Sequence, residues 1–517
     1  MNSVDHVIIG SGINALVAGA MLALKGDKVL LLERSDRPGG CLRTDEITLP
    51  GFHHDVMATT FVLFMTGQAG ATLGPHLARH GFEYCHSPHP TAVLRPDGSS
   101  LVLAMDRGRN VAVFNGLAAG DGVRHARDVG GIEADAPFLF SLLGGDLWSW
   151  PTFRLLVGQA RKRGLRGLAA WFGTALTPAR AWLETGYASP LVQALFAPWV
   201  LHCGLTPEST YGGQMGRVIA FALEAAGAPI SKGGAGRAVQ AFVALIEERG
   251  GEVRLGAEVD RINVVGSRVT GVTLTGGEVI AARSVLASVA PGQLQGRLLR
   301  DLGLPDDGAQ AFRHGRGNFQ LHYALDKHPE WLSPGLEDVA LIHLSDGIDA
   351  VSKSANEAER GMLPATPTIC VGQPSRLDPS RCPEGKAVLW LQIPDAPRVI
   401  KGDAGGAIAG QTWDDVREAF ADRIEGILAA HIKDFHKIKL ARRAYSPADL
   451  ERMNINLVGG DPYGGVCTID QFFIWRPYAK GPAAPLIRGF VHIGASTHPG
   501  PGLGGGSGFL AAKRLGA

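Results

Sequence analysis

Val7-Ile8-Ile9-Gly10-Ser11-Gly12-Ile13-Asn14-Ala15 is the stretch that decides the fold of this chain. Its apolar start predicts a short buried strand, and the alanine- and leucine-rich residues 16–24 that follow predict a helix. A strand, a glycine turn and a helix in this order open a Rossmann-type unit, which binds a dinucleotide.

Each small residue of the turn has a predicted job. Gly10 permits the tight turn, Gly12 lets the backbone approach a pyrophosphate, and Ala15 allows close packing of helix on strand. Ile13 and Asn14 open the helix, whose free N–H groups and positive dipole end face phosphate. We therefore predict that these five residues bind the cofactor.

An acidic residue ends the next predicted strand. Val29 to Leu32 is apolar, and Glu33 follows it at about the distance expected for the acid that binds a ribose hydroxyl. A carboxylate there disfavours a 2′-phosphate, so NADP is not the expected occupant. We predict that Glu33 and its neighbour Arg34 both bind the cofactor. A chain with 70 glycines is expected to match the glycine motif by chance. The strands, the helix and the acid beside this motif agree with one another and support a nucleotide-binding role.

Composition sets the broad class of the protein. A length of 517 residues predicts more than one domain, and a formal net charge of +1 gives no field that attracts nucleic acid. The six cysteines form no Cys-x-x-Cys pair, which predicts a reducing compartment, no metal site and no redox-active disulfide. We expect a cytoplasmic protein that binds no nucleic acid.

One segment leaves contact with a membrane surface open. Residues 153–174 combine Arg161, Lys162, Arg163 and Arg166 with leucines and aromatic residues. This pattern fits a solvated helix face, and it also fits an amphipathic helix that lies on a lipid surface. The uncharged run 7–24 belongs to the nucleotide-binding unit, because its glycines and the missing basic flank are unlike a signal peptide or anchor.

The predicted cofactor domain is discontinuous. We predict an α/β protein in which residues 1–60, 216–290 and 444–517 form a Rossmann-type domain with a hairpin turning at Gly276-Gly277. Residues 61–215 and 291–443 form an inserted mixed α+β domain for substrate. Its first part reads as mostly helical, and its second part contains alternating segments at 318–323 and 387–392 that predict antiparallel strands.

Three motifs carry a family resemblance. They are the opening fingerprint through Glu33 to Gly39-Gly40, the segment from Asp470-Gln471-Phe472 to Arg476-Pro477, and Gly494-Ala495-Ser496-Thr497-His498-Pro499-Gly500. On these motifs the chain resembles the FAD-dependent flavin amine oxidase superfamily along most of its length. It resembles in particular the phytoene desaturase and carotenoid isomerase-like branch, which includes the pyridine nucleotide-disulphide oxidoreductase domain-containing proteins.

The resemblance implies FAD as the cofactor and assigns residues to it. It places Gly39, Gly40 and Cys41 beside the pyrophosphate and ribityl chain, and it places the backbone of Val259 at the adenine. It places the terminal glycine motif beside the isoalloxazine ring, through Gly494, His498, Gly502, Gly504 and Gly505.

Two departures from the family pattern bear on chemistry. Many amine oxidases have arginine after the glycine pair. This chain has Cys41 there, which makes it less similar to the polyamine and monoamine oxidases. Pro501-Gly502-Leu503-Gly504-Gly505 also differs from the usual glycine run. Cys467 suggests a covalent flavin tether, but its surroundings match the desaturase-like branch, so we expect noncovalent FAD.

Catalytic residues are harder to assign. A helix starting near Ser507-Gly508 would direct its positive end at the flavin and favour the anionic reduced form by about 1 kcal/mol. His498 and Lys232 are candidates for moving a proton. No catalytic base is assigned, since desaturation of an activated or allylic carbon needs no strong base.

The expected activity is dehydrogenation of a hydrophobic organic substrate by hydride transfer to flavin N5. The alternatives are an amine oxidase, a redox-neutral isomerase that uses reduced FAD, and a flavin-bearing protein without turnover. The electron acceptor is open between oxygen, a quinone and a second flavoprotein, and the oligomeric state is unknown.

Overall fold

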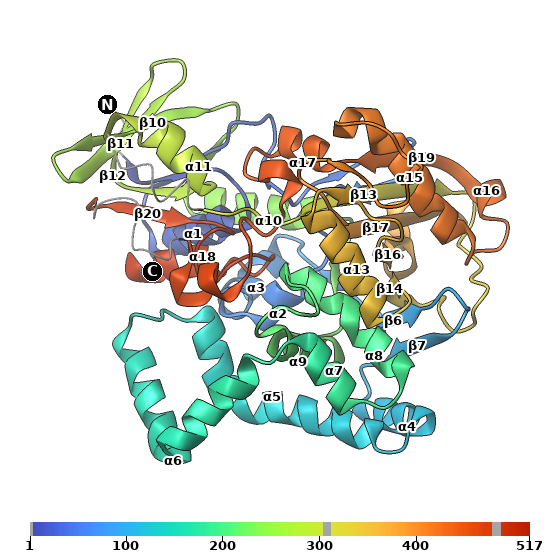
Figure 1. Ribbon diagram of the computed structural model, residues 1–517. Coiled ribbons are helices and arrows are strands. Elements are labelled where there is room, and N and C mark those ends of the chain that lie inside the picture. Colours follow the sequence, from blue (N-terminus) through green and yellow to red (C-terminus); the bar gives the residue numbers. More distant parts are fainter. Residues whose placement is uncertain (1–3, 303–311, 478–486) are drawn as a thin grey trace.

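A computed structural model of the chain describes residues 4–302, 312–477 and 487–517 (Figure 1). Two seven-stranded sheets organise this described part, one near the chain termini and one on the opposite side of the molecule. The predicted fold class, a Rossmann-type unit joined to a mixed α+β region, is confirmed. The domain boundaries remain a prediction.

The first sheet is the nucleotide-binding one. Its order is β10-β11-β12-β1-β2-β9, with β20 beside β12. The first two predicted strands are confirmed as β1 and β2, which pair in parallel with Ile8 opposite Leu31. The strands are β1 (Val4–Ile9), β2 (Val29–Leu32), β9 (Glu252–Arg254), β10 (Val259–Val265), β11 (Arg268–Leu274), β12 (Val279–Ser288) and β20 (Phe490–Ile493).

Helices cover one face of this sheet. Helix α1 packs between α10 and α18, and its apolar side chains meet those of β1 and β2 in one buried cluster. The predicted hairpin is also confirmed, because β11 pairs antiparallel with β10 and with β12. The helices are α1 (Ile13–Lys25), α2 (Val62–Thr66), α3 (Gln68–Arg79), α10 (Ala235–Glu248) and α18 (Gly506–Arg514). The segment that follows α11 (Pro291–Gln293) packs on the opposite face, where Leu294 joins a cluster with Val7 and Leu30.

The second sheet has the order β19-β13-β17-β16-β14-β6-β7. The predicted antiparallel strands at 318–323 and 387–392 are confirmed as β13 and β17, with Leu321 opposite Leu391. The strands are β6 (His89–Leu94), β7 (Ser100–Leu103), β13 (Gly317–Leu325), β14 (Val339–Leu344), β16 (Ile369–Gly372), β17 (Ala387–Ala396) and β19 (Lys439–Tyr445).

Two of these strands come from the region expected to be mostly helical. β6 and β7 form a hairpin, in which the Gly98 amide donates to the Arg95 carbonyl across a tight turn. The turn residues Asp97-Gly98 are typical of a hairpin, a signal that the prediction of a mostly helical region did not take into account.

The two faces of the second sheet differ. Phe319 and Leu321 of β13 pack with Phe420 of α15 (Trp413–Ala429) in an apolar core. The alternate residues Gln320 and His322 lie on the other face, which meets the loop around Met57 and β4 (His54–Asp55). The polar face of the second sheet therefore turns toward the nucleotide-binding half.

Helices 107–226 lie below both sheets, and α5 and α6 extend from them as an arm (Figure 1). Gly164, with φ 71°, interrupts the helical backbone of α6. None of the described helices has the length and apolar character needed to cross a bilayer. The helices here are α4 (Arg107–Leu117), α5 (Asp121–Gly144), α6 (Trp150–Ala175), α7 (Ala179–Gly186), α8 (Pro190–Phe196), the 3-10 helix η1 (Ala197–Cys203) and α9 (Gly212–Ala226).

Shorter elements complete the described chain. Small two-stranded sheets pair β3 with β4, β5 with β8, and β15 with β18. Their bounds, with the remaining helices, are β3 (Thr44–Asp45), β5 (Tyr84–Cys85), β8 (Ile230–Ser231), β15 (Met362–Leu363), β18 (Gly402–Asp403), α13 (Ile348–Glu359), α14 (Pro374–Leu377), α16 (Phe435–Ile438) and α17 (Pro447–Met453).

Candidate cofactor and active site

The turn between β1 and α1 has the shape of a phosphate cradle. Gly10 has φ 92°, which favours glycine, and Gly12 caps α1 without a side-chain hydrogen bond to the helix. A Cβ placed on Gly12 would meet no atom within 4 Å, so the space beside the helix N-terminus is open. Open space, free N–H groups and the positive helix end together fit a pyrophosphate.

The second glycine pair lies directly against this turn. A Cβ on Gly40 would approach the Gly12 Cα to 3.1 Å, and the Gly39 amide donates to Ser11 Oγ at 3.0 Å. Segments 10–15 and 39–41 thus meet at the start of α1, as expected for two loops that share one cofactor.

Hydrogen bonds hold the side chain of Glu33 beside the glycine turn that precedes α1. Its carboxylate accepts from the amide and hydroxyl of Ser11, at 3.0 and 2.5 Å, and from those of Ser35, at 3.0 and 2.8 Å. The side chain is buried at the carboxyl end of β2. It is positioned beside the glycine turn, where an acid that binds ribose is required.

The strand predicted to meet adenine begins next to Glu33. The Ala257 amide donates to the Glu33 carbonyl at 2.8 Å, and Val259 is buried two residues later. The Val259 carbonyl accepts from Arg297 at 2.7 Å. Arg34, also predicted at the cofactor, has a half-exposed side chain that lies 3.8 Å from Glu258.

The terminal glycine motif reaches the same helix. Gly494 follows β20, and its amide donates to Ser507 Oγ at 3.2 Å. A Cβ on Gly505 would lie 2.4 Å from Val17 Cγ2, so the loop touches α1. The helix expected near Ser507 is present as α18, which begins at Gly506. Three glycine segments that are distant in sequence therefore converge on α1.

Comparison with known proteins identifies this arrangement. A family described as Flavin containing amine oxidoreductase matches residues 183–463, and an NAD(P)-binding Rossmann-like domain matches residues 8–73. The chain belongs to the flavin containing amine oxidoreductase family. The predicted resemblance is confirmed, and the protein is a flavin-dependent oxidoreductase of the amine oxidase and carotenoid desaturase superfamily.

Several relatives align along almost the whole chain. Pyridine nucleotide-disulfide oxidoreductase domain-containing protein 2 of Rattus norvegicus is 27% identical, covering 98% of this chain and 92% of its own length. A limonene dehydrogenase component of Castellaniella defragrans is 26% identical, covering 99% and 94%. A solved putrescine oxidase variant, 13% identical, has a TM-score of 0.63 and covers 99% of this chain and 98% of its own; it shows the shared fold.

In this flavoenzyme the side chain of His498 forms a hydrogen bond that fixes a backbone segment. Its Nε2 lies 2.8 Å from the carbonyl of Gly145, in the connection between α5 and α6, and burial lowers the pKa of the imidazole. Arg476 has a similar task, since its guanidinium donates to the carbonyls of Ala495, Tyr463 and Gly464. The structure thus ties both motif residues to main chain, and a catalytic role for His498 remains a prediction.

Lys232 lies at the surface. Its ammonium is 2.9 Å from the Glu83 carboxylate, and both side chains are more than half exposed. This is the geometry of a solvated ion pair, which contributes little to stability.

The two cysteines near the cofactor loops are shielded from water, Cys41 partly and Cys467 fully. Burial raises the pKa of Cys41 to about 11, with Asn454 Nδ2 3.5 Å from its sulfur. Burial also raises the pKa of Cys467 to about 11, and its sulfur lies 3.6 Å from the Gly465 carbonyl. Neither thiol is a ready nucleophile at neutral pH.

An apolar cavity separates the cofactor loops from the second sheet. The Ala58 amide donates to the Cys41 carbonyl, and the next residues, Thr59 and Thr60, line a small cavity of about 10 Å³, which has room for about one water molecule. The opposite wall is mostly apolar and comes from the sheet and from segment 228–230, through Ala228, Ile230, Ala340, Leu341, Gly372, Gln373, Pro374, Leu377 and Trp390.

The sheet also fixes the loop that borders this cavity. The Met57 carbonyl accepts from Trp390 Nε1 at 3.2 Å and from Gln320 Nε2 at 3.3 Å. His54 and His322 face one another nearby, with ring centroids 5.5 Å apart, and burial lowers the pKa of His54 to about 3. Burial lowers the pKa of His322 as well, so both imidazoles are neutral at physiological pH.

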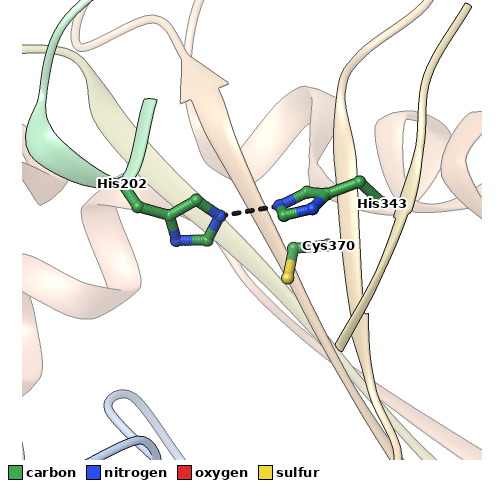
Figure 2. Close-up of side chains that lie close together, drawn as sticks. All are labelled: His202, His343 and Cys370. Atoms are coloured by element: carbon green, nitrogen blue, oxygen red, sulfur yellow. Dashed lines mark hydrogen bonds between the residues drawn. The ribbon is translucent and has the colours of Figure 1, made fainter. Parts of the chain in front are cut away.

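Two groups of side chains were not predicted from the sequence, because they bring together residues that are far apart in the chain. The buried Arg381 pairs with Asp55 at 2.9 Å and with Asp378 at 3.0 Å. His202 lies beside His343 and Cys370 (Figure 2). No local spacing signals either group.

Proposed function

We propose that this chain binds FAD noncovalently and dehydrogenates a hydrophobic organic substrate. The observation that carries the proposal is the apolar lining of the small pocket behind Thr59 and Thr60, one residue beyond the contact to Cys41. Apolar substrate surface packed against such a lining gains free energy by leaving water, at about 25 cal/mol per Å² buried.

The converging segments are the proposed FAD site. Gly12 and Gly40 would flank the pyrophosphate, Glu33 would accept from the ribose, and the loop from Gly494 to Gly505 would border the ring. When bound, FAD supplies a hydride acceptor at N5, which the protein itself lacks.

The chain's own residues orient substrate and exclude water. Trp390 and Gln320 hold the Met57 carbonyl, which keeps the loop 56–60 against the sheet. The uncapped N-terminus of α18 presents a positive dipole end worth about 1 kcal/mol to a negative charge nearby. No described residue lining the cavity is a strong base, which suits oxidation of an activated C–H bond.

Anaerobic reduction of the flavin tests the proposal. The purified protein is mixed with alkenes, polyenes, ketones and amines of graded polarity, and flavin bleaching and product mass are recorded. We expect bleaching by an apolar compound, with a product two hydrogens lighter. Acid precipitation should leave the yellow colour in the supernatant, since noncovalent FAD is released.

Other outcomes would replace the proposal. Bleaching by amines with hydrogen peroxide formation in air would indicate an amine oxidase. A product of unchanged mass, formed only after the flavin is reduced, would indicate an isomerase. FAD binding without bleaching by any compound would indicate a protein without turnover.

A further inference from the structure

A group of three metal-ligating side chains lies on the inner face of the second sheet, outside the proposed FAD site. His343 on β14 stands directly opposite Cys370 on the antiparallel strand β16, so their side chains emerge side by side on one face. The short helix η1 brings His202 over that face (Figure 2).

The ligand atoms of the group converge. His202 Nε2 and His343 Nε2 lie 2.8 Å apart, and the ligand atoms of both imidazoles and of the thiol lie within 4.8 Å of one another. A tetrahedral zinc with Zn–N bonds of about 2.0–2.1 Å holds two nitrogens about 3.3 Å apart. The observed separation is that of a hydrogen bond (Figure 2) and is about 0.5 Å shorter, so the imidazoles would move apart to admit the ion.

The surroundings supply buried polar groups that have no partner in the described part of the chain. His343 Nδ1 is one, and the indole Nε1 of Trp199 is another. The Trp199 ring packs against both imidazoles, at centroid distances of 4.7 and 4.9 Å. Burying such groups unpaired costs free energy, and a metal-bound water is a partner for the indole N–H.

We propose that His202, His343 and Cys370 form a binding site for one Zn²⁺ ion. Two imidazole nitrogens and a thiolate match the borderline-soft preference of zinc, and three protein ligands leave a fourth position open. Leu341 and Gly372, two residues along each strand from His343 and Cys370, line the small apolar cavity, so the proposed metal site lies two strand positions from it. This proposal departs from the sequence-based expectation of no metal site.

Metal stoichiometry tests the site without a substrate. The full-length FAD-loaded protein is treated with a chelator, reconstituted with Zn²⁺ or Co²⁺, and passed through gel filtration before metal analysis. We expect one equivalent of zinc per chain. Bound Co²⁺ should give tetrahedral d–d bands at wavelengths longer than flavin absorption, and added Zn²⁺ should remove them.

Variants assign the ligands. Cys370→Ser and His343→Gln should each weaken zinc binding by about 100-fold or more, since even residues that only orient ligands change affinity by 10–100-fold. Cys85→Ser, which alters a thiol on β5, should bind zinc as the wild type does. If Cys370→Ser fails to retain FAD, His202→Gln replaces it, because His202 is partly exposed at the end of η1.

Two results would overturn the proposal. One is wild-type protein that retains far less than one equivalent of zinc after gel filtration. The other is unchanged zinc binding in the ligand variants. Either result leaves the proposed dehydrogenase activity untouched, because flavin bleaching is measured separately.

Discussion

The Gly508 amide donates a hydrogen bond to Asn14 Oδ1 at 3.2 Å, and so joins the two ends of the chain at the start of α1. A Cβ on Gly508 would lie 1.8 Å from the Asn14 carbonyl oxygen. Helices α1 and α18 therefore approach one another as closely as backbones allow, and this contact brings the terminal glycine loop to the nucleotide-binding turn.

Replacing Gly508 should separate the two helices. Gly508→Ala cannot be accommodated without moving backbone, so we expect a loss of about 3 kcal/mol in the free energy of unfolding and weaker FAD retention. Urea unfolding and the fraction of flavin retained after gel filtration measure both effects.

Gly426→Ala is the matched control, because Gly426 lies within α15 and a Cβ there would meet no atom within 4 Å. Alanine favours a helix by about 1 kcal/mol over glycine, so this variant should be as stable as the wild type or more so. Equal stability of both variants would contradict the close approach of α1 and α18.

Local sequence patterns predicted the parts of the fold whose residues are neighbours in the chain. The turn at Gly10 to Ala15, the hairpin at Gly276-Gly277 and helix α18 all follow from spacing and glycine placement. The triplet His202, His343 and Cys370 does not, because strand pairing between β14 and β16 and the position of η1 create it. For the same reason the pairing of Arg381 with Asp55, which lies 326 residues away, was not predicted.

Glu33 is expected to contribute strongly to cofactor affinity. Glu33→Ala removes the predicted ribose acceptor and leaves the buried Ser11 amide without its partner. A hydrogen bond to a charged group contributes about 1.5–3 kcal/mol, so the Kd for FAD should rise by about 10- to 100-fold. Flavin fluorescence quenching measures it.

Glu252→Ala serves as the comparison, since this exposed residue on the neighbouring strand β9 pairs only with Arg254 within the described chain. It should leave the Kd for FAD unchanged. An unaltered Kd in Glu33→Ala would remove Glu33 from the cofactor site.

Acid should destabilise the protein through its buried histidines. The pKa of His54 is about 3 in the folded chain and about 6.5 in the unfolded one, so below pH 6.5 the unfolded state binds the extra proton. The free energy of unfolding therefore falls as the pH falls, by up to about 1.4 kcal/mol per pH unit for this residue.

His54→Gln should flatten that dependence. Glutamine does not titrate and can keep a hydrogen bond to Thr48 Oγ1, which lies 2.7 Å from His54 Nε2. Urea unfolding between pH 7 and 4 gives the slope for each protein. Identical slopes in variant and wild type would mean that His54 is protonated in the folded state.

Arg381 should be the most costly buried charge to remove. It neutralises Asp55 and Asp378, both buried, and these acids join the loop before α2 to the second sheet. Arg381→Met leaves two unpaired carboxylates, so we expect a loss of about 3–5 kcal/mol in urea unfolding. Arg452→Met, which removes a half-exposed guanidinium paired with Asp414 and Asp449, should cost less than about 1 kcal/mol.

The arm formed by α5 and α6 is expected to touch lipid. Trp148 is 84% exposed, Trp150 66% and Leu165 78%, and the basic residues at 161–166 lie on the same arm. Exposed apolar side chains beside basic ones favour an anionic bilayer surface. The protein should therefore co-sediment with phosphatidylserine vesicles, and added salt should weaken the binding.

Replacing the two tryptophans separates lipid insertion from charge attraction. Trp148→Ser with Trp150→Ser should lower vesicle binding at least about tenfold, because each indole buries a large apolar area in the headgroup region. Leu332→Ser removes an apolar side chain that is 62% exposed elsewhere on the surface, and it should bind as the wild type does. Equal losses of vesicle binding in both variants would indicate nonspecific adsorption. Vesicle binding that survives the tryptophan replacements but disappears in salt would show that the arm binds lipid by charge attraction alone.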